Sequence, residues 1–173
     1  TERVVYSFYG RSTQGSTNKI FMLEWKCDEM NTYKGVWRDV TRGGEAPGPR
    51  YGHSMSYSGQ KTLLFFGGQN SNGEFFNDLW FYTFRTRMWC KEEAAGSPSK
   101  RSFASIIALK NDILLFGGLS PGGELLNDMY LLRPKTGRCI WERILLRGAV
   151  PRGRMSAALL SSGVYKNDSR EEM

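Results

Sequence analysis

The stretch LLFFGGQNSNGEFFNDLWFY, residues 63–82, decides the fold because the same order of residue types returns fifty positions later. The second copy is ILLFGGLSPGGELLNDMYLL, residues 113–132. In both copies a hydrophobic run ends in two glycines, and Asn-Asp and an aromatic residue follow at a fixed distance. The recurrence indicates a structural unit that the chain repeats.

Four columns of residues recur with a period near 50, which is typical of a propeller blade or a similar array. The columns are Gly67-Gly68 with Gly117-Gly118; Asn77-Asp78 with Asn127-Asp128; Trp37, Trp89 and Trp141; and Pro-x-x-Arg at 47–50, 98–101 and 151–154.

Each unit also carries the local signals of four strands. The segments SFASIIAL, DILLFGG, DMYLL and GRCIWERI are short, rich in β-branched, aromatic or leucine residues, and separated by Gly, Pro, Asn and Ser. Short loops between them predict an antiparallel meander of strands A, B, C and D, with strand A at about 51–57 and 102–109. No segment shows a sustained helical period.

We expect the repeated residues to have structural roles. Paired glycines allow a turn and close approach of a neighbouring sheet, the aspartates can accept hydrogen bonds from loop N–H groups, and the aromatic residues can fill the space between sheets. This set contains Trp37, Gly67, Gly68, Asn77, Asp78, Trp89, Gly117, Gly118, Asn127, Asp128 and Trp141.

The order of strand, Gly-Gly, loop, aromatic residue and Trp resembles the kelch repeat of β-propellers. The resemblance implies an all-β fold with four-stranded antiparallel blades, in which 1–173 is a single segment of a propeller. We expect a degenerate blade of strands B to D at 1–46, complete units at 47–97 and 98–150, and an inner strand with a polar tail at 151–173. The first unit has only Gly10 for the doublet, Asn18-Lys19 for Asn-Asp, and an insertion, KCDEMNTYKG, that should lengthen its loop from C to D.

These strands make about three blades, whereas the resemblance implies closed rings of six or seven, so we expect a partial propeller. The last strand A and the first strands B to D would complete one blade, within a larger ring or between two copies that form a six-bladed homodimer. The N-terminal TERVVYSFYG is interpreted as the cut edge of a longer protein. An open edge is an aggregation hazard, so a partner should cover it.

Arg50, Arg101 and Arg154 open the innermost strands and should ring one mouth of the central channel. Guanidinium groups suit carboxylates, which makes an acidic peptide the natural ligand. Alternatively, each Arg pairs with loop carbonyls or a neighbouring Asp and holds the blades together. The candidate partner-binding residues are Arg50, Tyr51, His53, Gln69, Asn70, Asn72, Arg101, Phe103, Ser120 and Arg154.

The residue inventory argues against catalysis. A single histidine, His53, cannot build a multi-histidine metal site and is expected to satisfy backbone groups, and no GxSxG motif occurs. We therefore expect no enzyme activity, metal or cofactor. Cys27, Cys90 and Cys139 form no CxxC pair, which favours a reducing, cytoplasmic location.

The function predicted from these features is a non-catalytic protein-interaction module. Its partner would be another protein or the remainder of the same polypeptide. The net charge of +7 is spread over scattered basic residues, so nucleic acid is an unlikely partner, and no apolar run is long enough for a membrane span. The alternative is a regulatory or substrate-binding portion of a larger enzyme, such as a kelch-linked phosphatase or ubiquitin-ligase adaptor.

Overall fold

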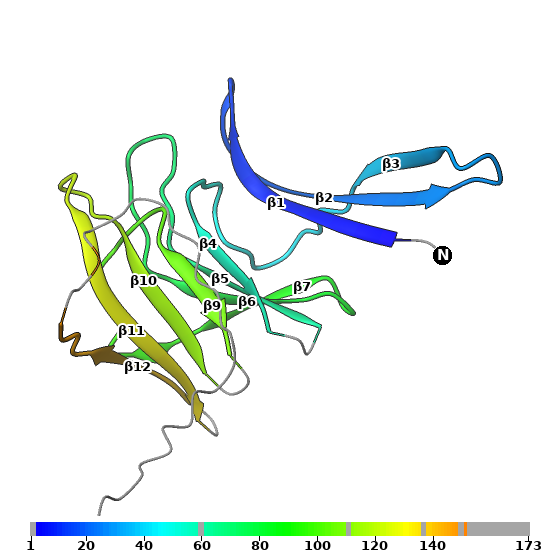
Figure 1. The fold of residues 1–173 in the computed structure, drawn as a ribbon. Helices are drawn as coiled ribbons and strands as arrows, with labels where there is room; N and C mark the ends of the chain where they lie inside the picture. Colours follow the sequence, from blue (N-terminus) through cyan, green and yellow to red (C-terminus); the bar gives the residue numbers. More distant parts are fainter. Residues whose placement is uncertain (1–2, 59–60, 110–111, 136–137, 149–150, 152–173) are drawn as a thin grey trace, which may run out of the picture.

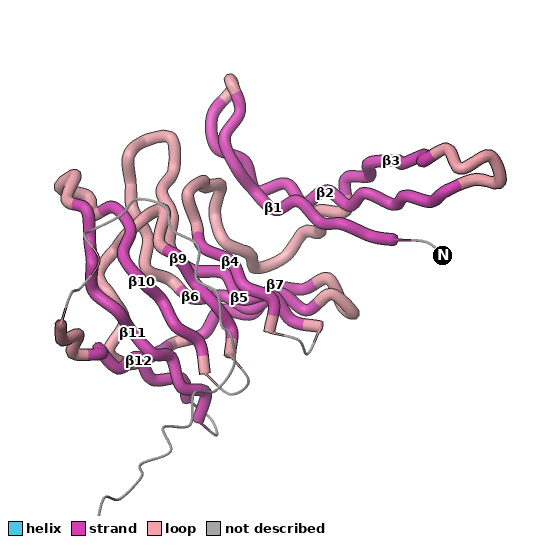
Figure 2. Tube along the Cα trace, viewed as in Figure 1, coloured by secondary structure: helices cyan, strands magenta, loops and turns pink. Residues whose placement is uncertain are grey.

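A computed structural model describes residues 3–58, 61–109, 112–135, 138–148 and 151 (Figure 1). Within these residues the secondary structure consists of strands joined by loops, without a helix (Figure 2). No helix in this part of the chain is therefore long and apolar enough to span a membrane. The strands form three sheets, and Figure 1 shows the second sheet between the other two.

The first sheet contains β1 (Arg3–Ser12), β2 (Gly15–Cys27) and β3 (Tyr33–Asp39), in that order and antiparallel. They lie where strands B, C and D of the first unit were expected. The insertion KCDEMNTYKG is not a longer loop, however, because it extends β2 and β3 as a paired hairpin. Only residues 28–32 turn, and the Asp28 Oδ1 atom accepts hydrogen bonds from the N–H groups of Met30 and Thr32. A local Asx-type turn thus replaces the expected loop.

The second sheet is a meander of β4 (Ser54–Tyr57), β5 (Thr62–Phe66), β6 (Leu79–Thr83) and β7 (Met88–Glu92). The third repeats it with β9 (Ser105–Ala108), β10 (Ile113–Leu119), β11 (Leu125–Lys135) and β12 (Arg138–Ile144). A short strand that sequence reasoning missed, β8 (Ala94–Ala95), leaves the second unit and pairs in parallel with β12. It extends the outer edge of the third sheet.

The core lies in two layers between the three sheets. The first layer packs Phe8, Ile20 and Met22 against Leu63, Phe65 and Tyr82. In the second layer, Leu64 and Phe66 of β5 pack with residues of the third sheet, among them Ile113, Leu115 and Leu132. Alternate residues of β5 therefore face different sheets, which explains why its sequence LLFF is hydrophobic without alternation.

The tryptophans of β7 and β12 face the preceding sheet. The Trp141 ring lies 5.4 Å from that of Phe66, and the Trp89 ring lies 6.0 Å from that of Phe8. Trp37 has the same place in the first sheet but is 54% exposed, because no described sheet precedes it. The expected packing role therefore holds for two of the three tryptophans.

Candidate functional site

One end of the sheets gathers the loops that follow β1, β5 and β10 (Figure 1). We call this end the mouth; it comprises residues 11–16, 51–53, 69–74, 102–103 and 119–124. Backbone bonds join successive sheets here, because the Gly10 N–H donates to the Arg50 carbonyl (3.1 Å) and the Gly68 N–H to the Arg101 carbonyl (2.9 Å). The mouth is thus a set of loops fixed to a rigid frame, which is a common setting for recognition.

Arg50 and Arg101 do not present their guanidinium groups at the mouth, so that expectation is wrong. They are only 2% and 0% exposed. Arg101 donates to both carboxylate oxygens of Asp128, at 2.6 and 2.9 Å, and Arg50 donates to both of Asp78, at 2.5 and 3.0 Å. The alternative, pairing with an aspartate and loop carbonyls, describes both arginines. Each pair lies within one sheet, however, because it links the segment before the sheet's first strand to the beginning or interior of its third strand, and it does not link two adjacent sheets. Arg154 lies outside the described residues.

Asp78 and Asp128 were expected to accept hydrogen bonds from loop N–H groups, but the structure gives them a different role. They accept guanidinium donors, and Asp78 also accepts a bond from Trp80 Nε1 at 2.7 Å. Asn77, just before it, donates from Nδ2 to the Pro98 carbonyl at 3.0 Å and so holds the segment that leads into the next sheet.

The glycine doublet allows the close contacts expected of it. Gly67 has φ 64°, and a Cβ atom there would lie 2.7 Å from the Arg101 carbonyl oxygen. In the first sheet Tyr9 occupies this place, and it keeps the left-handed backbone with φ 55°. Its hydroxyl donates to the Pro47 carbonyl at 2.9 Å, which ties β1 to the segment before β4.

Two polar candidates of the mouth shape their own loops. The Asn70 Oδ1 atom accepts the N–H groups of Asn72 and Glu74, and the Ser120 Oγ atom accepts the N–H of Glu124. The two loops use the same position in the same way. Gln69 exchanges backbone bonds with Tyr51, and Asn72 is exposed. Asn72 is therefore better placed to meet a partner than Asn70 or Ser120.

His53 packs as an aromatic ring. It stacks on Phe65 with ring centroids 4.3 Å apart, and Tyr9 meets it edge-on at 5.9 Å. Its buried Nδ1 atom has no hydrogen-bond partner in the described part of the chain. The expected bond to a backbone group is therefore not formed by Nδ1. Burial, and secondarily the charge of Arg50, lower the pKa of His53 from 6.5 to about 4, which keeps the ring neutral at neutral pH.

Besides exposed loop residues such as Asn72, the mouth contains a row of three accessible side chains, Arg11, Tyr51 and Phe103, which we call the rim row. The Arg11 guanidinium carbon lies 5.1 Å from the centroid of the Tyr51 ring, and Nη1 lies 3.4 Å from the Tyr51 hydroxyl oxygen. The rings of Tyr51 and Phe103 are 6.3 Å apart. Arg11 is exposed and the two rings are partly exposed.

Sequence reasoning named Tyr51 and Phe103 but missed Arg11. The signal was available, because Arg11 follows Gly10 as Gln69 follows Gly68. Extending the glycine column to the degenerate first unit would have found it.

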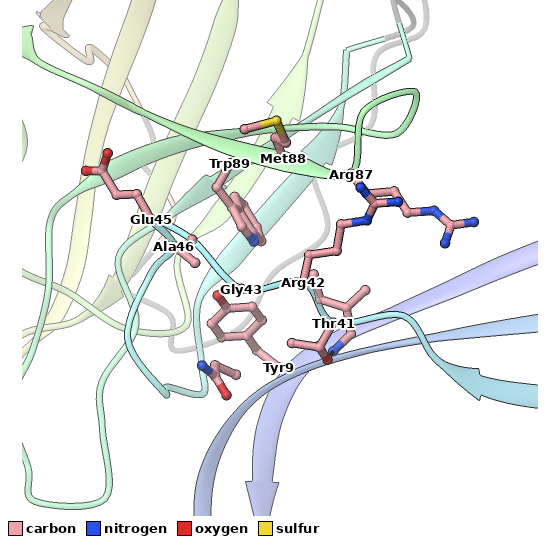
Figure 3. A pocket seen from close by; sticks show the side chains of 12 residues that line it. Tyr9, Thr41, Arg42, Gly43, Glu45, Ala46, Arg87, Met88 and Trp89 are labelled. Carbon is pink, nitrogen blue, oxygen red and sulfur yellow. Dashed lines mark hydrogen bonds between the residues drawn. The ribbon is translucent and has the colours of Figure 1, made fainter.

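A separate pocket of about 160 Å³ lies between the first two sheets, beneath residues 41–46. Figure 3 shows the rings of Tyr9 and Trp89 on one side, and Arg42 and Arg87 on the other. Its volume is below the roughly 300–1,000 Å³ usual for ligand sites. The described residues also contain no group of three or more His, Cys, Asp or Glu side chains that could hold a metal ion.

The antiparallel sheets and the repeated glycine doublets agree with the result of a comparison with protein families. The family model described as the KLHDC2/KLHL20/DRC7 Kelch-repeats domain matches residues 1–167. Domains of this kind are generally non-catalytic scaffolds that mediate protein–protein interaction. The chain therefore belongs to the KLHDC2/KLHL20/DRC7 kelch-repeat family.

Proposed function

We propose that the mouth of this protein-interaction module binds an acidic segment of a partner protein through the rim row. The observation that carries the proposal is that the Arg11 side chain is exposed and lies against the Tyr51 ring. The side chains of Arg50 and Arg101, by contrast, already form ion pairs with aspartates. Arg11 therefore replaces those two arginines as the residue that would meet a carboxylate.

The geometry of the rim row supports this choice of ligand. Contact with the Tyr51 ring restricts the Arg11 side chain, which reduces the entropy lost when it binds. Its guanidinium group can form charge-assisted bonds to a carboxylate, each contributing about 1.5–3 kcal/mol. The partly exposed rings of Tyr51 and Phe103 offer apolar area beside that charge.

The position of Phe103 is itself well defined. Its φ is 57°, its N–H donates to the Gly52 carbonyl at 2.5 Å, and a Cβ atom on Gly52 would lie 2.9 Å from its ring. A ring held in this way by the backbone is a preformed contact for a partner side chain.

The test uses one fluorescent peptide with alternating Glu and Phe and a matched peptide with Gln for Glu. Anisotropy titrations should show that Arg11→Glu weakens binding of the Glu peptide by about tenfold or more, the loss expected for one charge-assisted contact. The Gln peptide should bind weakly to both forms. The control is Arg85→Glu, which changes net charge equally in the exposed turn between β6 and β7, at the other end of the strands.

Equal weakening by Arg85→Glu would refute the proposal, because general attraction to a chain of net charge +7 would then explain the binding. Phe103→Ala provides a second test, of the apolar part of the rim row. It should weaken binding of both peptides, since it removes apolar area and leaves the charge unchanged.

The proposal also includes the cellular setting. The three thiols are free, and those of Cys27 and Cys90 are exposed, which supports a reducing cytoplasmic location. We propose no cofactor. The same peptide test applies if the chain is the regulatory or substrate-binding portion of a larger enzyme. Fractionation of cells that express the tagged chain tests the location, and recovery in the secretory fraction would contradict it.

A further inference from the structure

Two arginines line one side of the pocket between the first two sheets without a carboxylate partner. Arg42 follows β3 in the segment that leads to the second sheet, and Arg87 lies in the turn between β6 and β7. Arg38, which is also exposed, forms an ion pair with Glu24. Among the described residues, by contrast, neither Arg42 nor Arg87 forms an ion pair or a side-chain hydrogen bond.

The acidic side chains closest in sequence to Arg42 are directed to other groups. Asp39 Oδ2 accepts a hydrogen bond from Lys19 Nζ at 2.9 Å, and Asp39 Oδ1 accepts one from the Thr41 N–H at 2.9 Å. In Figure 3 the Glu45 carboxylate points away from the two guanidinium groups. This side of the pocket therefore carries two positive charges that the described residues leave without a counter-charge.

The backbone fixes the position of Arg87. Its φ is 56°, in the left-handed region that is unfavourable for a residue with a Cβ atom, and its N–H donates to the Thr83 carbonyl at 2.8 Å. The side chain of Arg87 is partly buried and lines the pocket, whereas Arg85 in the same turn is exposed and does not line it. The turn thus directs one of its two arginines to the pocket.

A buried hydroxyl without a partner lies near the same two arginines. Tyr82 is 1% exposed, and its hydroxyl has no hydrogen-bond partner among the described residues. Burial raises the pKa of Tyr82 and Tyr6 adds to the rise, whereas the charges of Arg87 and Arg42 oppose it, so both charges act at this hydroxyl. A buried donor without an acceptor is unfavourable, and a bound oxyanion would supply the acceptor.

We propose that this side of the pocket binds the phosphate group of a phosphorylated serine or threonine of a partner protein, with Arg42, Arg87 and the Tyr82 hydroxyl as donors. A phosphate monoester carries a charge of about −1.5 to −2 at pH 7 and three acceptor oxygens, which match two guanidinium groups and a hydroxyl. A carboxylate has one negative charge and two oxygens, and satisfies these donors less completely.

The surroundings favour a peptide as the carrier of the phosphate. The pocket, of about 160 Å³, is smaller than the sites that enclose whole small molecules, so only the phosphate group would enter it. The chain that carries the phosphate would lie on the surface, where Met88 beside the pocket is 63% exposed and offers apolar contact.

This inference concerns a second surface of the protein-interaction module. The pocket lining contains no residue of the rim row, and Arg87 lies at the end of β6 opposite the mouth. Binding of a phosphate group here does not depend on binding of an acidic segment at the mouth.

The test uses a fluorescent peptide of Gly and Leu residues around one phosphoserine, and two matched peptides with Ser or Asp in its place. Anisotropy titrations against the full chain at constant ionic strength should show at least tenfold tighter binding of the phosphoserine peptide. Arg42→Gln and Arg87→Gln should each weaken that binding by about tenfold, the loss expected for one charge-assisted contact. Tyr82→Phe keeps the ring and should weaken it by about threefold.

The matched control is Arg85→Gln, which removes the same charge from the same turn but outside the pocket. It should change the affinity by less than about twofold. Equal weakening by Arg85→Gln and Arg87→Gln would overturn the proposal, because general attraction to a chain of net charge +7 would then explain the binding. Equal binding of the phosphoserine and Asp peptides would overturn it as well, and an unchanged affinity in Tyr82→Phe would overturn the role of the hydroxyl.

Two further measurements identify the place and the source of the phosphate. The indole N–H resonance of Trp89, assigned with Trp89→Phe, should shift on binding, because this ring lines the pocket. The peptide of alternating Glu and Phe should not displace the phosphoserine peptide, since displacement would place both ligands on one surface. Inorganic phosphate should compete only at a much higher concentration than the unlabelled phosphoserine peptide. Competition at equal concentrations would contradict a peptide ligand and assign the site to free phosphate.

Discussion

Arg101 shows how completely a charged side chain can be committed to structure. All five of its N–H donors have acceptors: the Ser99 carbonyl and Oγ, the Gly117 carbonyl, and the two Asp128 carboxylate oxygens. Arg50 repeats most of this pattern with Asp78. A guanidinium group so satisfied has no donor left for a ligand, although its residue type and spacing suit one.

Replacing Asp128 should destabilise the fold strongly. Asp128→Asn leaves the fully buried Arg101 without its counter-charge, so the free energy of unfolding in urea should fall by about 3–5 kcal/mol. Glu142→Gln breaks an exposed pair with Arg133 and should change it by less than about 1 kcal/mol. Similar effects of the two variants would show that burial of the guanidinium group does not govern the cost.

His53 should make stability depend on pH. Its pKa is about 4 in the folded chain and 6.5 when exposed, so between these values the unfolded chain binds the extra proton. Stability should therefore fall as pH drops from about 6.5 to about 4, by up to about 3 kcal/mol. Urea unfolding of the native chain and of His53→Phe, compared across this range, measures the effect. An unchanged slope in His53→Phe would assign the dependence to other groups.

At the scale of elements, equivalent strands differ in burial from one sheet to another. β5 is buried on both faces and its residues from Leu63 to Phe66 are all apolar. In β1 the residues facing the second sheet, Tyr6 and Phe8, are covered, whereas Val5 is 49% exposed. Neighbours on one side or both, rather than strand propensity, explain the difference in burial.

The tryptophan column gives a test of this view. Trp141→Ala removes a ring that is 3% exposed and packed on Phe66, and should lower the free energy of unfolding by about 3–5 kcal/mol. Trp37→Ala alters the same position of an uncovered sheet and should cost less than about 1 kcal/mol in the free chain. Comparable losses, measured by urea unfolding, would mean that Trp37 is covered in solution.

On the scale of the whole molecule, three sheets share two apolar layers, and only the middle sheet is packed on both faces by described residues. Strand positions, the order within each sheet and kelch membership were predictable, because they depend on hydrophobic runs and turn residues that are close in sequence. The parallel strand β8 was not, since two alanines carry little strand signal and their partner, Cys139–Ile140, lies far along the chain.

The sequence by itself determined the repeat, the all-β architecture and the family, because a period near 50 and the glycine, aspartate and tryptophan columns can be read locally. Only the tertiary structure decided which arginines are free. Arg50 and Arg101 meet their aspartates 28 and 27 positions away, and burial by neighbouring strands makes those pairs structural. Arg11 remained exposed because it ends a strand at the mouth with Tyr51 beside it, a contact across 40 positions that local patterns do not encode.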